Sequence, residues 1–319
     1  MEIVNVNNLK KAYGDVYAVN DITFKIKAGE IFGFLGPNGA GKTSTINMLI
    51  GLSRPSEGQI VINGIDVIKD SKKAQRIIGV VPDESNLYDD MNGFENLCFC
   101  ASLYGIEKEE REKRAKELLK IFNLDNVSER SYKAYSKGMR RKLTIAAGII
   151  HDPQILFLDE PTTGIDVESA RQIRELILDL KDQGKTIFLT THYIEEAERI
   201  CDRIAFIVEG KIVRISTLAE LMENEVREHT IKLSITGNIK EIKDELEKEF
   251  KSIRIEIPED INTCLIISKE GAPLFPIINW LNNKGISVYE AKEIKPRLED
   301  IFVKITGIES SIKKVGMDK

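Results

Sequence analysis

Cysteine, histidine and long hydrophobic runs are scarce in this sequence of 319 residues. The four cysteines are Cys98, Cys100, Cys201 and Cys264, and only three histidines accompany them. No two cysteines have the C-x-x-C spacing typical of structural zinc sites, and the set does not suggest a disulfide framework. We therefore expect reduced thiols, most of them buried.

Hydrophobic segments long enough to cross a membrane are also missing. The longest apolar stretches, residues 60–68 and 143–150, are much shorter than the roughly 20 residues that span a bilayer. The N-terminal residues alternate between apolar and polar and include an acidic residue at position 2, unlike a secretory signal. These features predict a cytoplasmic protein.

An excess of positive charge is absent as well. The 46 lysines and arginines are outnumbered by 51 aspartates and glutamates, which gives a formal net charge of -5. Since sequence-independent binding to nucleic acid needs a basic field, we expect no nucleic-acid partner. The apolar fraction of 42% and the charged fraction of 30% are typical of a compact globular protein, and the length favours two domains.

Buried strands and helices alternate through much of the sequence. Continuous apolar runs at 31–36, 154–160 and 186–192 are each followed by a helical pattern, which predicts an α/β fold with a parallel sheet. The alternating segments 2–10 and 16–27 predict an antiparallel pair of strands.

Two further regions differ from this pattern. Residues 92–150 contain three helical stretches and no convincing strand, which predicts a helical insertion. After residue 218 the pattern changes to short strands and charged helices. We predict a first domain at 1–218 and a small α+β domain at 219–319, with Trp280 in the core of the latter.

A glycine-rich segment, GPNGAGKTS, lies between an apolar strand and the start of a helix. It satisfies the pattern G-x-x-x-x-G-K-[ST], whose backbone N–H groups and helix dipole bind phosphates. Lys42 would reach the β- and γ-phosphates, and the Thr43 hydroxyl would bind Mg²⁺. The nucleotide-binding candidates in this segment are Gly36, Asn38, Gly39, Ala40, Gly41, Lys42, Thr43 and Ser44.

Two carboxylates follow the apolar run ILFL at the end of another predicted strand. Asp159 would hold Mg²⁺, and Glu160 would orient or deprotonate the attacking water. A strand can also end in acidic residues simply because it leaves the core. These two positions alone therefore do not distinguish a catalytic site from an ordinary strand end.

These motifs occur together with two others, YSKGMRRKL at 135–143 and TTH at 190–192. In their order and spacing they resemble the ATPase subunit of ABC transporters, over about residues 1–216. The resemblance implies a P-loop NTPase cassette, with a RecA-like parallel sheet core, an antiparallel β lobe and a helical subdomain at about 92–150. It implies ATP and Mg²⁺ as ligands.

The resemblance assigns further residues to the site. Ser136, Lys137, Gly138 and Met139 match the signature motif, which closes over the ATP of a second subunit. Ser136 is also a good helix N-cap, and Gly138 would let the backbone approach a phosphate closely. The partner implied is a second copy of the chain or a paralogous ATPase subunit.

Four more positions match the family. Gly164 and Asp166 correspond to a loop that crosses the dimer interface, and His192 corresponds to a histidine that contacts the γ-phosphate and the water. Tyr13 corresponds to the aromatic that stacks on adenine, although a tyrosine there could also belong to the core. A lone histidine would ordinarily be a satisfied core or surface group.

The sequence departs from the usual family pattern at two places. Asp83 occupies a position that is usually glutamine, so that a shorter, charged group would lie beside Mg²⁺. The signature has Lys137 and Met139 where glycine and glutamine are commonest.

The resemblance predicts a subunit that hydrolyses ATP and powers a separate transmembrane permease, for export, from the inner face of the cell membrane. Two other functions are considered. A soluble ABC ATPase acting on ribosomes or DNA fits less well, because only one phosphate loop is present and only about 100 residues separate it from the signature. A nucleotide-gated regulator is disfavoured because Lys42, Asp159, Glu160 and His192 are all present. For residues 219–319 the sequence favours interaction or regulation.

Overall fold

The computed structural model describes residues 1–84, 86–225, 229–237, 239–258, 262–269, 271–294 and 298–307. The chain divides into two compact units. The first, called here the cassette unit, contains Met1–Leu218 and also, among the described residues, 305–307 at the end of helix α11 (Leu298–Thr306). The second, the C-terminal unit, contains Ala219–Lys304.

An antiparallel lobe opens the cassette unit. Its four strands are β1 (Glu2–Tyr13), β2 (Val16–Lys27), β4 (Glu57–Ile62) and β5 (Ile65–Asp66), in the order β2-β1-β4-β5. Alternating residues of β2 are buried, as expected for a strand with one face on the core. The predicted antiparallel pair is therefore confirmed, and β1 runs on to Tyr13.

A six-stranded sheet forms the centre of the cassette unit, in the order β10-β9-β3-β8-β7-β6. Its strands are β3 (Ile31–Leu35), β6 (Ile78–Val81), β7 (Ile155–Asp159), β8 (Thr186–Thr191), β9 (Arg203–Val208) and β10 (Lys211–Thr217). Five strands are parallel, and β10 returns antiparallel to β9. Every residue of β3, β7 and β8 is buried, as in parallel sheets covered on both faces. The α/β fold prediction is confirmed.

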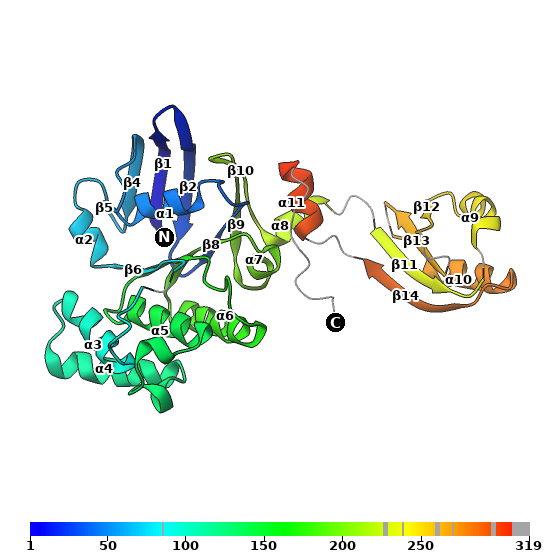
Figure 1. The fold of residues 1–319 in the computed structure, drawn as a ribbon. Coiled ribbons are helices and arrows are strands. Elements are labelled where there is room, and N and C mark those ends of the chain that lie inside the picture. The colour runs from blue at the N-terminus through cyan, green and yellow to red at the C-terminus, as the bar shows by residue number, and fades with distance from the viewer. Residues whose placement is uncertain are drawn as a thin grey trace. The chain divides into compact units, whose positions relative to one another are not determined.

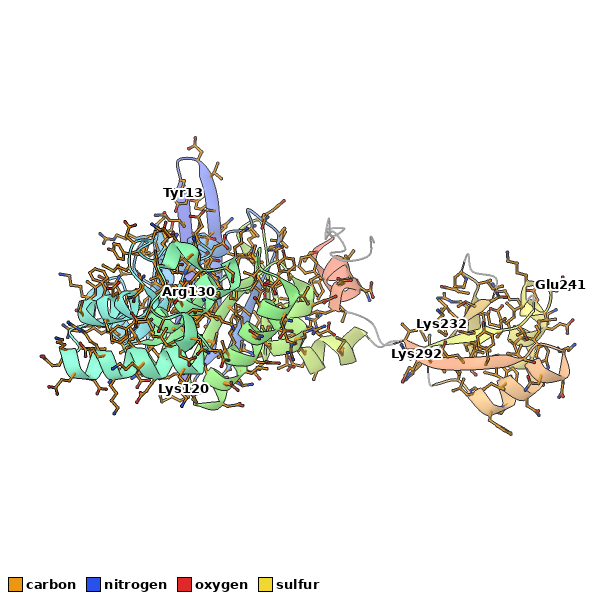
Figure 2. All side chains as sticks on the ribbon, turned by 60° about the horizontal axis from the view of Figure 1, so that its bottom comes forward. Tyr13, Lys120, Arg130, Lys232, Glu241 and Lys292 are labelled. Carbon is orange, nitrogen blue, oxygen red and sulfur yellow. The ribbon has the colours of Figure 1, made fainter. Side chains whose placement is uncertain are left out.

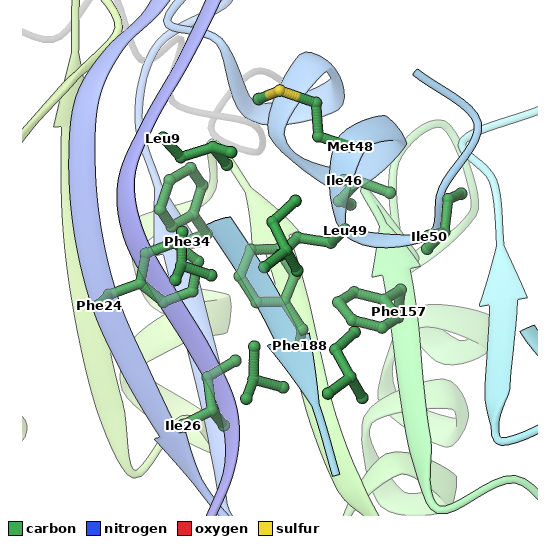
Figure 3. Packing of buried hydrophobic residues seen from close by; sticks show 14 of the residues in the cluster. Leu9, Phe24, Ile26, Phe34, Ile46, Met48, Leu49, Ile50, Phe157 and Phe188 are labelled. Atoms are coloured by element: carbon green, nitrogen blue, oxygen red, sulfur yellow. The ribbon is translucent and has the colours of Figure 1, made fainter. Parts of the chain in front are cut away.

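Aromatic side chains join the lobe to the central sheet (Figure 3). The ring of Phe24 on β2 lies 5.8 Å from that of Phe34 on β3 and 6.1 Å from that of Phe188 on β8. Helix α1 (Lys42–Leu49) packs into the same core through residues that include Ile46 and Leu49. This packing fixes the start of α1, and with it the glycine-rich loop, against the end of β3.

Helices surround this sheet, and α3, α4 and α5 lie on the side away from the antiparallel lobe (Figure 1). The α-helices are α2 (Ser71–Gln75), α3 (Gly93–Leu103), α4 (Lys108–Ile121), α5 (Lys137–Ile149), α6 (Val167–Asp182) and α7 (Ile194–Ile200). Short 3₁₀ turns, η1 (Asp125–Val127) and η2 (Tyr132–Ala134), precede α5. The three helices predicted between 92 and 150 are present as α3, α4 and α5.

The C-terminal unit is a β-α-β-β-α-β arrangement with a four-stranded antiparallel sheet in the order β12-β13-β11-β14. This is the topology of ferredoxin-like split βαβ domains. Its elements are β11 (His229–Ile235), η3 (Ile239–Glu241), α9 (Lys243–Glu249), β12 (Ile253–Glu256), β13 (Thr263–Ser268), α10 (Leu274–Asn283) and β14 (Val288–Ile294). Trp280 is partly buried and packs against the core of this unit. Helix α8 (Leu218–Glu225), which precedes β11, is not predicted from the sequence.

None of the helices in the described ranges is both long and apolar enough to cross a bilayer.

Candidate active site

The predicted phosphate loop and the charged residues meet at one edge of the central sheet. Strands β3, β8, β7 and β6 are neighbours in that order, and ligands of parallel sheets bind at the carboxyl ends of the strands. A pocket of about 300 Å³ opens there. It is lined by Ala18, Asn38, Gly39, Gly41, Lys42, Thr43, Ser44, Asp83, Glu160, Thr163 and His192.

The glycine-rich loop is held close to the backbone around it. Gly41 has φ 101°, and a side chain there would collide with the carbonyl of Ala18. The Lys42 side chain is only 6% exposed and bends back over the loop, where Nζ donates to the carbonyls of Gly36 (2.8 Å) and Pro37 (3.2 Å). The loop therefore presents a buried ammonium group at the floor of the pocket.

Asp159 lies next to this loop and is almost fully buried. One of its carboxylate oxygens accepts a hydrogen bond from the Thr43 hydroxyl at 3.0 Å, and the other accepts one from the Thr190 hydroxyl. A threonine hydroxyl beside a carboxylate fits Mg²⁺, which prefers oxygen ligands and usually binds one or two carboxylates together with substrate phosphates. The donor set thus suits the metal that the resemblance implies.

Glu160 is at the centre of the charged groups. Its Oε1 lies 3.2 Å from Lys42 Nζ, and its Oε2 lies 2.6 Å from His192 Nδ1 and accepts a hydrogen bond from Thr163 at 3.0 Å. Burial alone would raise the pKa of Glu160, but the hydrogen bond from His192 and the charge of Lys42 bring that pKa below its ordinary value. The carboxylate is therefore ionised near neutral pH and able to accept a proton.

Asp83 follows β6 and also lines the pocket. Burial raises the pKa of Asp83; Arg141 opposes this effect, while the nearby Asp159 and Glu160 carboxylates add to it. Asp83 and Glu160 thus both line the pocket where phosphates would enter, and the pocket has one more acidic group than a glutamine at position 83 would give.

Tyr13 does not line this pocket. It lies at the end of β1 on the hairpin with β2, where its side chain is 56% exposed (Figure 2). The Lys11 ammonium group lies 5.0 Å from the centre of its ring. The alternative of a core tyrosine is therefore wrong, and the ring has an accessible face.

The predicted signature residues lie outside the pocket, around the start of α5. Ser136 caps this helix, as predicted, by accepting a hydrogen bond from the Met139 amide at 3.2 Å. Lys137 is exposed, whereas Gly138 is buried, and a side chain at Gly138 would collide with the Ser169 hydroxyl on α6. Packing against Ser169 thus favours glycine at this position. The close approach of its backbone to a phosphate stays a prediction.

The predicted interface loop also lies outside the pocket. Asp166 caps α6 by accepting hydrogen bonds from the Ser169 amide (2.8 Å) and the Ser169 hydroxyl (2.7 Å). Both Gly164 and Asp166 are exposed. Because Ser169 meets Gly138 as well, the start of α5 and the loop before α6 are packed together within one chain.

Several residues of the site have no assigned role from the sequence alone. Thr190 binds Asp159, and its carbonyl accepts from the Glu160 amide at 3.1 Å; Thr163 binds the Glu160 carboxylate. Thr190 belongs to the TTH motif and lies in a buried apolar strand. A polar residue in such a strand is a sequence feature that could have indicated its role in the site. The sequence gives no comparable indication for Arg141, because its partners are backbone carbonyls of other elements.

Comparisons with known proteins agree with this geometry. The sequence profile of the "ABC transporter" family matches residues 19–163. The "Nod factor export ATP-binding protein I" of Burkholderia orbicola (strain AU 1054) is 36% identical over 306 residues, which cover 96% of this chain and 97% of that protein. The "Linearmycin resistance ATP-binding protein LnrL" of Bacillus subtilis (strain 168) is 38% identical over 235 residues, covering 74% of this chain and 76% of that protein.

A solved structure is similar to the cassette. It is described as the dimeric structure of a post-hydrolysis state of the ATP-binding cassette MJ0796 bound to ADP and Pi, and it matches with a TM-score of 0.63 and 30% identity, over 67% of this chain and 98% of that one. The fold and the site define a P-loop ATPase. The chain belongs to the ABC transporter family, and within that family it is an ATP-binding ATPase.

Proposed function

We propose that this chain is the ATP-hydrolysing subunit of an ABC exporter, which dimerises around two ATP molecules and drives a separate transmembrane permease from the inner face of the membrane. The observation that carries this proposal is the similarity to an export ATP-binding protein over 96% of the chain, which includes the C-terminal unit. The site supports it through the close grouping of Lys42, Glu160 and His192.

The charged and polar residues at this edge of the sheet have proposed tasks in hydrolysis. The loop amides and Lys42 would bind the β- and γ-phosphates and neutralise their charge. Thr43 and Asp159, with Asp83 as a further candidate, would hold Mg²⁺, and the bound ion would supply positive charge that stabilises the negative charge developing on the phosphates. In this arrangement the chain itself mainly positions the reacting groups.

Glu160 and His192 would prepare the attacking water. The Glu160 carboxylate would accept a proton from the water, and His192, already hydrogen-bonded to it at 2.6 Å, would orient the carboxylate and contact the γ-phosphate. Since these groups lie beside Lys42, the proton acceptor and the phosphate-binding cation are within reach of one substrate.

The start of α5 is proposed to act on the partner's nucleotide. Ser136 and Lys137 are exposed at the N-terminus of a 13-residue helix, where backbone N–H groups and the helix dipole favour an anion. Because these residues do not line their own pocket, a second copy of the chain or a paralogous ATPase subunit would supply the ATP they contact. Gly164 and Asp166 would lie at that interface.

The C-terminal unit is proposed to serve interaction or regulation. Its split βαβ fold has its own core, formed by residues such as Leu233, Ile266 and Leu281. The relative from Burkholderia orbicola extends over this part of the chain, so the unit accompanies the cassette in an export ATP-binding protein.

Transport direction can be tested in inside-out membrane vesicles that contain this chain and the membrane protein encoded next to it. Linearmycin is the first probe, because one relative is named for resistance to it. For an exporter of this compound we expect ATP-dependent accumulation in the vesicle lumen, and none with the E160Q variant. Accumulation in right-side-out vesicles instead would show import and overturn the export proposal.

Tyr13 provides a prediction about nucleotide affinity. Stacking of a base on an aromatic ring contributes roughly 1–2 kcal/mol, so Tyr13→Ala is expected to weaken ATP binding about five- to thirtyfold with little change in kcat. Tyr13→Trp, which keeps the aromatic face, should bind nearly as well as the unmodified chain. Titration with a fluorescent ATP analogue measures the effect, with Tyr289→Ala, an exposed tyrosine of the C-terminal unit, as the control. An unchanged affinity in Tyr13→Ala would exclude the stacking role.

A further inference from the structure

Arg141 has an unusual set of partners for a charged residue. It lies on α5, five residues after the helix cap Ser136, and only 4% of it is exposed. Its guanidinium donates to four backbone carbonyls: Nε to Pro161 (2.8 Å), Nη2 to Asp159 (2.7 Å), and Nη1 to Asp83 (2.9 Å) and to Pro82. These carbonyls belong to the segments that leave β6 and β7 at the active-site edge of the sheet.

The contacts hold the backbone on both sides of Glu160. Glu160 has φ 50°, in the left-handed region that residues other than glycine rarely adopt, and such a conformation persists only when its surroundings fix it. Arg141 binds the carbonyl of the preceding residue and that of the following one. Glu160 itself donates its amide to the Thr190 carbonyl at 3.1 Å. Arg141 thus holds the backbone from which the Glu160 side chain extends on both sides of that residue.

The following turn is fixed from a second side. The Thr162 hydroxyl donates to Glu196 on α7 at 2.6 Å, and Glu196 is almost fully buried. The turn after Glu160 is thus tied to α5 by Arg141 and to α7 by Glu196. Helix α7 begins two residues after His192, so both partners of the hydrogen bond between Glu160 and His192 are anchored through this network.

We propose that Arg141 is a positioning residue, which holds Glu160 and the Asp83 segment in place relative to α5 and so links the signature end of that helix to the hydrolytic site of the same chain. This inference rests on the proposed function, in which the N-terminus of α5 contacts the ATP bound by the partner subunit. A helix is stiff over the five residues from Ser136 to Arg141. A shift of α5 on contact with that ATP would therefore move the carbonyls that flank Glu160.

The chemistry requires arginine rather than any cation. A guanidinium presents five donors in a planar fork, whereas an ammonium has three donors around a single point. The fork serves four carbonyls on two segments, which is more than the three donors of an ammonium can satisfy. Arg141→Lys would keep the charge and lose this geometry, and Arg141→Met would keep an apolar stem of similar length without any donor.

The test compares these two variants with the unmodified chain. In both we expect kcat to fall about 10- to 100-fold, while the Kd for a fluorescent ATP analogue and the KM for ATP stay within threefold. We also expect the ATP dependence of hydrolysis to lose cooperativity, because the two sites would no longer communicate through α5. The control is Arg114→Gln. Arg114 on α4 also donates to a backbone carbonyl, that of Ile150, which lies at the opposite end of α5 from Ser136. This variant should keep kcat within twofold.

Several outcomes would overturn the proposal. These are a kcat within twofold of the unmodified value in Arg141→Met, a loss of ATP affinity as large as the loss of kcat, full rescue by lysine, or loss of the folded state in both variants by circular dichroism. The proposed dimer is tested separately in the E160Q background, by light scattering with ATP. If E160Q stays monomeric, the dimer proposal fails; if it dimerises while Arg141→Met hydrolyses ATP normally, the positioning role fails.

Discussion

Replacement of Glu160 by glutamine is expected to reduce kcat by about 10²- to 10⁴-fold, the usual contribution of a general base. The amide has nearly the same size as the carboxylate but cannot accept the proton of the attacking water. Because the pKa of Glu160 lies below its ordinary value, the carboxylate is ionised at neutral pH in the unmodified chain, and the substitution removes an active base. Release of phosphate measures the loss.

The E160Q variant should still bind ATP, because the phosphate loop and Lys42 remain in place. We expect its Kd for an ATP analogue to stay within a few fold, and we expect ATP to trap a dimer that light scattering detects. Glu175→Gln is the matched control, since Glu175 is an exposed glutamate on α6 that pairs with Arg171. Hydrolysis by E160Q at the unmodified rate would refute the role of Glu160 as the base.

Substitution of Lys42 by alanine is expected to weaken ATP binding by about 2–4 kcal/mol, or roughly 30- to 1000-fold in Kd. Lys42 is the one lysine or arginine among the described residues that line the pocket. Its Nζ is almost fully buried, where a charge interacts more strongly than in water. The variant would also leave Glu160 without its cationic neighbour and add to the negative charge facing the phosphates.

Isothermal titration with ATP and Mg²⁺ would measure this loss. Lys69→Ala removes an exposed lysine near Asp66 and should leave the affinity unchanged, which controls for the effect of net charge. Lys42→Arg is expected to recover only part of the affinity, because a planar guanidinium does not reproduce the compact contacts that Nζ makes with the Gly36 and Pro37 carbonyls. An unaltered Kd in Lys42→Ala would show that the loop does not bind the phosphates in the proposed way.

The sequence alone determines the elements that depend on local pattern. Continuous apolar runs predict β3, β7 and β8, because a strand covered on both faces has no polar side. The glycine-rich loop is equally local, since its function depends on spacing within nine residues. Lys42 and Thr43 could be named from this loop, and Asp159 and Glu160 from the end of a buried strand, whereas His192 and Asp83 follow from the resemblance to ABC ATPases. The structure brings all six together at one edge of the sheet.

Weak or short elements could not be predicted in this way. The strand β5 has two residues and the helix α2 has five, too few for a periodic pattern to stand out. The periodicity of the sequence also does not predict the order of the strands in the C-terminal unit, because β11 pairs with β13 and β14, which are distant from it in the chain. Only these pairings define its split βαβ topology.

The tertiary structure alone decided how the site is held. Arg141 binds carbonyls near residues 82 and 160, and Gly138 must be small because Ser169 lies against it. Backbone carbonyls are the same in every residue, so no pattern of side chains in the sequence marks them as partners. The sequence determined which groups carry the chemistry, and the fold decided which residues fix their position, because hydrogen bonds and close contacts between distant segments exist only after the sheet has formed.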